Sequence, residues 1–384
     1  MSAKSIENPH DAVQLKKIND AWWFVSCEGE MFVSLGINHV EAPLMAGPHN
    51  RERTKGTYGS DFVNAEGLWN PEGDGVRRWT TRVRVDMRRW GFNTFGYHTM
   101  VPYQYLGSGL HYVRRAFTAA IEPYHRNMET PNIFSDTFAD RTRRTLETVC
   151  ADGCSDPYLL GYAFADCPPW RTDTAHAQLW LDSLAVERGG GTSVEQLAEQ
   201  WYRLHHDLVR EFDPCTPILG DKLLLGPDGV PDYLIPLLKE YTDLVYVQWQ
   251  GHFADQMDVL RDLHAATGLP ILLGNSSFSV HLPCHKPHSK GSPVASQMEV
   301  GQAYADYLRA ALSEPYIVGW HYDGYVEGRP GVEPDYDPTL CRQCGLLDPD
   351  ERVHEDAVTW IRSANAHAML WHSRVSSSCS GERG

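Results

Sequence analysis

Short apolar runs alternate with amphipathic stretches over most of the chain. Residues 23–25 and 31–33 predict a hairpin that turns near Gly29, and its second strand continues through residues 35–37. The other predicted strands are residues 92–97, 116–121, 159–165, 218–224, 244–249, 270–273 and 316–320. The helical pattern, with apolar positions three or four residues apart, covers residues 79–90, 141–149, 194–212, 233–240, 257–267 and 297–312.

The number and order of these elements predict the fold class. With the strand that contains Phe32 counted first, the chain has eight strands, and most of them are followed by a helix. This is the pattern of a single (β/α)8 TIM barrel, an α/β fold, with long loops after its strands. No glycine-rich phosphate loop follows the first strand, which disfavours a doubly wound open sheet. We expect a lead-in at residues 1–20, the barrel at residues 21–373 and a disordered tail at residues 374–384.

Composition and charge narrow the class of partner. With 42% hydrophobic and 22% charged residues, the chain can bury a large core, as globular proteins do. Its 34 basic and 50 acidic residues give a formal charge of −16, which disfavours nucleic acid and anionic membranes as partners. No run of eighteen apolar residues and no leader pattern occur, so we expect a soluble, cytoplasmic protein. The oligomeric state stays open.

Cysteine and aromatic content add two further indications. The nine cysteines are odd in number and unevenly spread, which favours reduced thiols or a metal site over a disulfide framework. The 12 Trp, 18 Tyr and 12 Phe residues supply many aromatic faces, and such faces pack against the C–H faces of sugar rings. The aromatic content therefore suits a carbohydrate-binding cleft.

The strand ends supply the candidate functional residues, because the active site of a barrel lies at the carboxyl ends of its strands. The side chains there are Asn38, His39, Glu41, Tyr97, His98, Glu122, Asp166, Cys167, Asp221, Gln248, Trp249, His252, Asn275, His321, Asp323, Tyr325 and Glu327. This ring of imidazoles, carboxylates, amides and aromatic groups fits a carbohydrate better than an acyl or phosphoryl substrate.

Several segments, taken in order along the chain, carry a resemblance to a known family. They are Trp22-Trp23-Phe24-Val25, Ser34-Leu35-Gly36-Ile37-Asn38, Trp90-Gly91-Phe92-Asn93-Thr94, Leu160-Gly161-Tyr162, Leu219-Gly220-Asp221 and Val318-Gly319-Trp320-His321-Tyr322. Over residues 22–366 the chain resembles agarase-like glycoside hydrolases of the large clan of retaining barrels. The resemblance implies a (β/α)8 fold and sugar substrates, of which galactan-type oligosaccharides are the best-known case.

Two positions depart from the pattern of that family. The family places its acid/base Glu after the fourth strand, in Asp-Asn-Glu, where this chain has Asp166-Cys167-Pro168. It places its nucleophilic Glu on the seventh strand, where this chain has Asn275. A retaining mechanism needs two carboxyl groups about 5 Å apart. Because neither Pro168 nor Asn275 is a carboxylic acid, double displacement should not operate at these two positions.

Our leading hypothesis is therefore glycosidic cleavage in an oligosaccharide by a non-standard mechanism. Inversion suits displaced groups because it tolerates carboxyl groups roughly 6.5 to 9.5 Å apart. In this scheme Asp166 is the general acid, with a pKa raised by burial, and Asp323 or Glu327 is the base. The expected substrate-binding residues are Asn38, His39, His98, Gln248, Trp249, His252, Asn275, Trp320, His321 and Tyr325. The alternative is a catalytically silent carbohydrate-binding barrel.

Catalysis needs no cofactor in the leading scheme, but zinc is a further alternative. Cys341 and Cys344 form a Cys-x2-Cys pair after the eighth strand, and Cys284 and His288 follow the seventh. Three thiolates and one imidazole would make a closed tetrahedral zinc site that holds the two loops together. We expect a structural role for such a zinc, although a zinc-bound thiolate could also serve as the nucleophile of a glycosidase. Cys167 we interpret as wall packing rather than as a nucleophile.

Overall fold

Eight parallel strands close into a barrel in the order β10-β13-β4-β5-β6-β7-β8-β9. The computed structural model describes residues 12–40, 50–66, 69–102, 105–107, 109–122, 131–154, 156–171, 175–188, 190–280, 291–328 and 344–378. The barrel strands are β4 (Ser34–Asn38), β5 (Thr94–Phe95), β6 (His111–Arg115), β7 (Leu159–Asp166), β8 (Ile218–Leu224), β9 (Val245–Gln248), β10 (Ile271–Ser276) and β13 (Ile317–Asp323). The predicted (β/α)8 barrel is thus confirmed.

The third barrel strand lies earlier in the chain than predicted. Strand β6 is His111–Arg115, whereas the sequence pattern placed this strand at residues 116–121. The apolar pattern did not indicate β6 because the strand ends in two arginines. Charged residues are uncommon in a strand with a covered face. Each has a local partner: Arg114 Nη2 lies 2.9 Å from Asp152 Oδ2, and the Arg115 guanidinium lies 4.8 Å from the centre of the Tyr97 ring.

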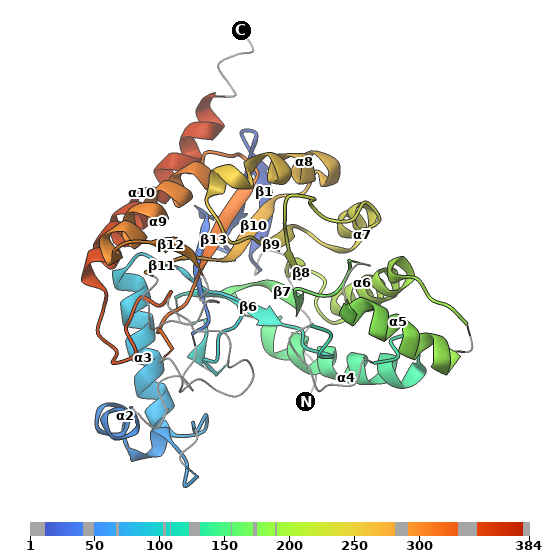
Figure 1. The fold of residues 1–384 in the computed structure, drawn as a ribbon, viewed down its shortest axis with the longest axis horizontal. Coiled ribbons are helices and arrows are strands. Elements are labelled where there is room, and N and C mark those ends of the chain that lie inside the picture. The colour runs from blue at the N-terminus through green and yellow to red at the C-terminus, as the bar shows by residue number, and fades with distance from the viewer. Residues whose placement is uncertain are drawn as a thin grey trace.

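Helices surround the barrel (Figure 1). They are α2 (Arg51–Tyr58), α3 (Asp74–Arg89), α4 (Asp136–Gly153), α5 (Ala175–Arg188), α6 (Val194–Phe212), α7 (Leu234–Tyr241), α8 (Met257–Thr267), α9 (Gln297–Ala311) and α10 (Glu355–Ser378), with 3-10 turns η1 (Ser60–Phe62) and η3 (Phe253–Asp255). The bounds predicted for α6 and α8 match, and a capping box between Ser193 and Gln196 fixes the start of α6. In the described part of the chain, no helix has the length and apolar character needed to cross a membrane.

Helix α10 corrects the boundary expected for the tail. The sequence analysis placed a disordered tail from residue 374, but α10 continues through Ser378. The inner face of α10 packs on α9, where Gly301 lets the two helices approach closely: a Cβ at Gly301 would meet the backbone of Ala357. Residues 379–384 lie outside the described residues.

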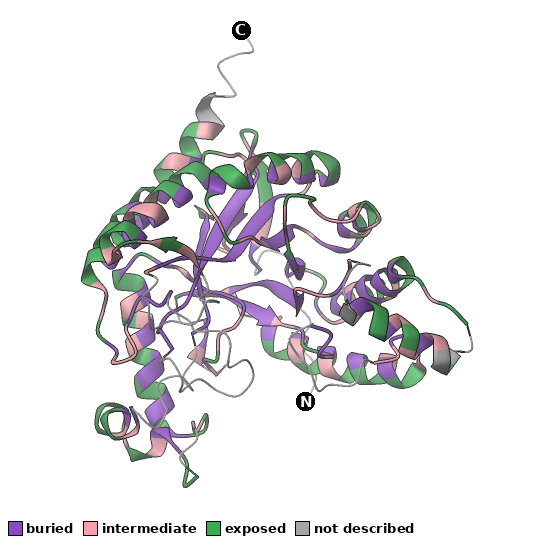
Figure 2. Cartoon of the chain, in the orientation of Figure 1, coloured by how far each residue is buried: buried purple, intermediate pink, exposed green. Residues whose placement is uncertain are grey.

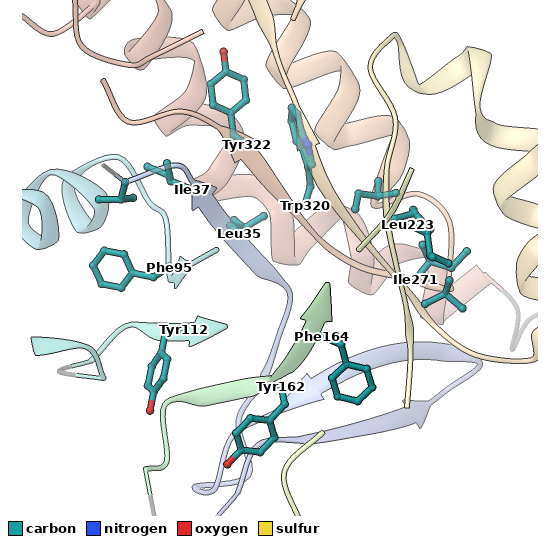
Figure 3. Close-up of a cluster of buried hydrophobic side chains, with 14 of the residues drawn as sticks. Leu35, Ile37, Phe95, Tyr112, Tyr162, Phe164, Leu223, Ile271, Trp320 and Tyr322 are labelled. Atoms are coloured by element: carbon teal, nitrogen blue, oxygen red, sulfur yellow. The ribbon is translucent and has the colours of Figure 1, made fainter. Parts of the chain in front are cut away.

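The buried side chains form two layers. The outer layer fills the space between strands and helices, and Figure 3 shows part of it, including Trp320 and Tyr322 from β13. The inner layer contains Leu160, Leu219 and Leu272 from β7, β8 and β10, so it lies inside the barrel. Figure 2 shows the barrel strands mostly buried, and the helices buried on the side that meets the barrel and exposed on the other.

An N-terminal hairpin covers one end of the barrel. Strands β1 (Gln14–Ile18), β2 (Ala21–Val25) and β3 (Met31–Phe32) form an antiparallel sheet, so the expected lead-in already contains a strand. Phe24 packs with the inner layer, and Trp22 N donates to Pro315 O, just before β13 begins. The hairpin therefore covers the amino end, and the opposite end, where the carboxyl ends of the strands lie, is called the mouth of the barrel. A two-stranded sheet of β11 (Phe278–Val280) and β12 (Ser292–Val294) lies beyond β10.

Candidate active site

Polar side chains meet inside the barrel at the carboxyl ends of its strands. Asn38 Nδ2, on β4, donates to Asn275 Oδ1, on β10, at 2.6 Å, although β13 lies between these strands. Gln248 Nε2, on β9, lies 2.8 Å from the Cys167 Sγ that follows β7, across β8. Bonds between strands that are not neighbours must cross the interior. The mouth of the barrel therefore holds a connected polar cluster, as the sequence predicted.

One side of this cluster is built on Asp166. Lys222 Nζ, on β8, lies 2.9 Å from Asp166 Oδ1, and His98 Nε2 lies 2.6 Å from Asp166 Oδ2. Both Lys222 and Asp166 are buried. Burial alone would raise the pKa of Asp166, but the Lys222 ammonium and the His98 imidazole hold it well below its usual range. Asp166 is therefore ionised, which corrects the expectation that it is a general acid with a raised pKa.

The other side of the cluster is built on His39. Its ring stacks on the ring of His98, with the centroids 4.2 Å apart. His39 Nε2 lies 3.3 Å from Asn275 Nδ2 and 3.5 Å from Asp323 Oδ1. Asn38 completes this side, because its Oδ1 accepts a hydrogen bond from the backbone N–H of Tyr97 at 2.7 Å. The stacked imidazoles thus lie between Asp166 and Asp323.

Asp323 differs from every other carboxylate of the cluster. It is fully buried, and neither of its carboxylate oxygens accepts a hydrogen bond from any residue in the described ranges. It ends β13, which lies directly opposite β7 in the closed barrel, so Asp323 and Asp166 lie on opposite sides of the mouth, with the stacked His39 and His98 rings between them. A buried carboxylate without donors is costly, and such a group is a candidate for contact with a ligand.

Glu122 lies beside Asp166. Its Oε1 accepts from the backbone N–H of Asp166 at 3.3 Å and lies 3.8 Å from Arg115 Nη2. Burial raises the pKa of Glu122 to about 7, against the lowering effect of hydrogen bonds and of Arg115. At neutral pH this carboxyl group is therefore protonated in a large fraction of molecules, so it can donate a proton where Asp166 cannot.

Three strand ends carry residues in the left-handed backbone region. They are His39 (φ 52°), Cys167 (φ 51°) and Asn275 (φ 50°), after or near the ends of β4, β7 and β10. For residues other than glycine this conformation costs on the order of 1–3 kcal/mol and persists where the surroundings impose it. Two of the three adjoin or occupy the positions at which the family resemblance places catalytic glutamates. A close approach also shapes this region, since a Cβ at Gly96 would overlap Asn38 Oδ1.

The structure places three of the predicted binding residues elsewhere. Trp320 faces the helices, where its Nε1 donates to Ser276 Oγ at 2.7 Å. Tyr325 is fully buried, and its hydroxyl donates to Asp86 Oδ2 of α3 at 2.7 Å. His321 lies inside the barrel, between Ser34 Oγ at 2.9 Å and Tyr246 OH at 3.3 Å. We therefore assign these residues to packing and not to substrate binding.

Two further predictions at the mouth need correction. Glu327 is buried, but its polar contacts among the described residues are with His354 Nε2, at 3.1 Å, and with Leu347 O. It is therefore not part of the cluster that contains Asp166 and Asp323. His252 is exposed and lines a groove of about 540 Å³ beside Phe253 and Tyr307, against α9. Gln248 and Trp249 are half-buried, and Gln248 alone has a polar contact with the cluster.

Lys222 is the site residue that the sequence did not indicate. The candidate on β8 was Asp221, which faces the helices and accepts from the Trp170 and Trp201 indoles at 2.8 and 3.2 Å. Leu219 packs inside the barrel, so strict alternation would place Asp221 inside as well. Gly220, with φ 67°, interrupts the alternation and turns Lys222 inward. No local sequence signal marks this irregularity apart from the glycine.

The zinc prediction falls largely on residues that the structure does not describe. Cys284, His288 and Cys341 lie outside the described residues. Cys344 is described and buried, and its carbonyl lies close to Gly324, just after β13. Among the described residues, no group of three or more His, Cys, Asp and Glu side chains is arranged to hold a metal ion. The zinc site stays a prediction, which metal analysis of the purified protein would test.

Comparisons with known proteins show the fold. No family model matches the sequence, and no curated protein matches it. The structure is similar to that of an agarase (TM-score 0.74, 16% identity, 97% of this chain and 67% of that chain). It is also similar to an exo-beta-agarase (TM-score 0.69, 14% identity, 94% of this chain and 66% of that chain). A β-galacturonidase from Eisenbergiella tayi bound to galacturonate matches at a TM-score of 0.56, with 13% identity over 92% of this chain and 54% of that chain.

These likenesses concern the barrel and its covering helices. The chain spans about two thirds of the length of the two agarases and about half that of the β-galacturonidase. At 13–16% identity, side-chain chemistry is not carried over with the fold. This chain is therefore a (β/α)8 barrel whose fold is similar to those of the two agarases and the β-galacturonidase.

Proposed function

We propose that this protein hydrolyses a glycosidic bond in an oligosaccharide, with galactan-type substrates favoured, at the carboxyl mouth of its barrel. The observation that carries the proposal is the buried Asp323 carboxylate, which accepts no hydrogen bond from a described residue and ends the strand opposite β7, where Asp166 and Glu122 lie. The shared fold with agarases and a β-galacturonidase supports sugar as the substrate class. The galactan preference rests on the agarase neighbours and on the sequence resemblance.

Asp323 is the general base in this scheme. In the proposed complex a sugar ring and a water molecule lie between Asp323 and Glu122, which is the arrangement that single displacement uses. The Asp323 carboxylate accepts a proton from the water as the water oxygen bonds to the anomeric carbon. The product then has the opposite anomeric configuration to the substrate.

Glu122 is the general acid and replaces Asp166 in that role. It gives its proton to the leaving glycosidic oxygen as the bond from that oxygen to the anomeric carbon breaks. With the pKa of Glu122 at about 7, the protonated form is present at neutral pH. After turnover Asp323 holds a proton and Glu122 has lost one, and exchange with solvent restores both.

The amides and imidazoles hold the sugar. Asn275 cannot form a glycosyl ester, and both ends of its amide already have contacts, Asn38 at Oδ1 and His39 at Nδ2. This arrangement fixes the orientation of the His39 ring next to Asp323. A rigid array of amide and imidazole groups is suited to bonding sugar hydroxyls, and it leaves the attack to water.

The experiment measures turnover of aryl glycosides and of galactan, arabinan and glucan oligosaccharides. Asp323→Asn and Glu122→Gln should each lower turnover about 10²- to 10⁴-fold, the usual contribution of a general acid or base. The matched control is Asp258→Asn on α8, whose carboxylate is exposed and pairs only with Arg261 in the described contacts. Proton NMR of the first product should show inversion, and retention would refute the scheme.

A silent carbohydrate-binding barrel is the second candidate. Two observations favour it. Both carboxylate oxygens of Asp166 have partners, Lys222 and His98, and position 275 has no carboxyl group. Calorimetric binding of an oligosaccharide without turnover of any substrate in the panel would select this function. Loss of oligosaccharide binding in Asn38→Ala or His39→Ala would show that the binding site is the carboxyl mouth of the barrel.

A further inference from the structure

Lys222 is a buried cation with no role in the scheme above. Its side chain is fully buried, and its ammonium lies 2.9 Å from Asp166 Oδ1 and 4.9 Å from the centre of the Tyr97 ring. A buried ammonium is costly unless a carboxylate or an aromatic face compensates it. Lys222 has both, so its position is fixed on two sides.

The charge on Lys222 determines what Asp166 can do. With the ammonium at Oδ1, Asp166 is held as a carboxylate, and an ionised carboxylate only accepts hydrogen bonds. Its second oxygen lies 2.6 Å from His98 Nε2, so the proton of this bond belongs to the imidazole. In a neutral imidazole one nitrogen carries the proton and the other accepts. His98 is therefore held as the Nε2–H tautomer, with Nδ1 as an acceptor.

The surroundings of His98 favour the neutral ring. The charged and titratable groups that face it are Asp166 from β7, Lys222 from β8, Arg115 from β6, His39 from the segment after β4 and the neighbouring Tyr97, whose ring packs edge-on against it. Burial and the positive charge of Lys222 lower the pKa of His98 well below its usual value, although Asp166 acts in the opposite direction. None of the described residues bonds to His98 Nδ1.

We propose that Lys222 is a positioning residue that acts through Asp166 to present His98 Nδ1 as the acceptor for a donor group of the substrate. The chain Lys222–Asp166–His98 runs from β8 to the segment after β5. The identity of the ligand, a sugar hydroxyl, rests on the proposed function. The chemical state of His98 does not, and it can be measured without turnover.

The first test is the tautomer of His98, by NMR of full-length protein labelled with ¹⁵N-histidine. His205 is an internal reference in the same spectrum. Its Nδ1 lies 2.7 Å from the Trp201 carbonyl oxygen, which can only accept, so its proton is on Nδ1. Thr118 Oγ1 lies 2.7 Å from His205 Nε2. We expect the opposite pattern for His98, with protonated Nε2 and bare Nδ1. A proton on Nδ1 of His98 would overturn the proposal.

The second test removes the charge. Lys222→Met should raise the pKa of His98 by about one to three units, because a nearby positive charge that disfavours the imidazolium is lost. Lys222→Arg keeps the charge and should shift the pKa of His98 by much less. His205, which is buried among other groups, should not change in either variant. An unchanged His98 pKa in folded Lys222→Met would overturn the proposal.

Activity measurements separate positioning from a merely structural effect. If the protein turns over a glycoside, Lys222→Met should move the acidic limb of the pH profile of kcat/KM upward together with the pKa of His98. A structural defect would instead lower kcat/KM equally at all pH values, and that result would count against positioning. If Lys222→Met does not fold, the wild-type tautomer and the Lys222→Arg titration still decide the question. If no glycoside is hydrolysed, the proposed function fails while the NMR outcome stands by itself.

Discussion

The two sides of the barrel mouth differ in how their charges are balanced. On the side of β7 and β8, the Asp166 carboxylate has an ammonium at one oxygen and an imidazole at the other. On the side of β13, the Asp323 carboxylate is equally buried, but its oxygens have no hydrogen-bond donor in the described chain. A buried carboxylate with a donor at each oxygen stabilises the fold, whereas a buried carboxyl group without a hydrogen-bond donor is free to accept one from a ligand. The carboxylate at the end of β7 is therefore less available to a ligand than the one at the end of β13.

The strongest test of this comparison is the stability of Asp166→Asn. Removal of one member of a buried ion pair leaves the Lys222 ammonium without its carboxylate, and we expect the free energy of unfolding to fall by about 3–5 kcal/mol. Urea unfolding at neutral pH measures this change. Asp258→Asn removes the exposed partner of Arg261 and should cost less than about 1 kcal/mol. Equal losses in the two variants would show that the Asp166 pair carries no special stability.

The next test concerns Glu122, the second carboxyl group on the paired side. Its pKa is raised by burial from 4.5 to about 7 in the folded protein, so its protonated form favours folding. The stability that it contributes is complete below pH 4.5 and is lost as pH rises to about 7. Glu122→Gln cannot ionise. As pH rises over this range, the free energy of unfolding of the wild type should fall relative to that of Glu122→Gln. The total change in the difference should be on the order of 3 kcal/mol.

Unfolding of both proteins at several pH values between 4 and 8 checks this difference. If the free energies of unfolding of the two proteins differed by the same amount at every pH between 4 and 8, the Glu122 carboxyl group would titrate as an exposed one does. The result would then also remove Glu122 as the proton donor, because an ionised group at neutral pH has no proton to give.

Much of the fold could be predicted from apolar periodicity. Strand β8 and helices α6 and α8 begin and end where the pattern places them, because each is a buried run with clear flanking signals. Strand β6 was displaced because Arg114 and Arg115 end it and are compensated by residues far away in the sequence. Local pattern contains no information about such partners.

The candidate site was predictable by position but not by the direction of side chains. Asn38, His39, His98, Asp166, Gln248, Asn275 and Asp323 were expected at the mouth, and the structure joins them there. Trp320 and Tyr325 lie on or after β13 as expected but point to the helices. Lys222 was missed because an irregularity at Gly220 changes which residues face inward. Whether a side chain points into the barrel or toward the helices depends on the register between neighbouring strands. A single sequence contains no information about this register.

The smallest expected effect concerns Asp323, and its sign is the informative part. Asp323→Asn removes a buried carboxyl group whose oxygens accept no hydrogen bond from a described residue, so the free energy of unfolding should rise by about 1–3 kcal/mol while turnover falls. The matched control is Asp213→Asn. Asp213 is just as buried, but it accepts hydrogen bonds from Tyr162 OH at 2.8 Å and from the Cys215 and Thr216 amides. That variant should lose stability.

Urea unfolding of the two variants under the same conditions provides the comparison. Opposite signs would show that Asp323 is kept at a cost in stability, as expected of a group that acts on a ligand. A loss of stability in Asp323→Asn as large as that in Asp213→Asn would mean that Asp323 is compensated in the folded protein. In that case the base for water attack would have to be sought elsewhere in the mouth, with His39 the nearest group that could accept the proton.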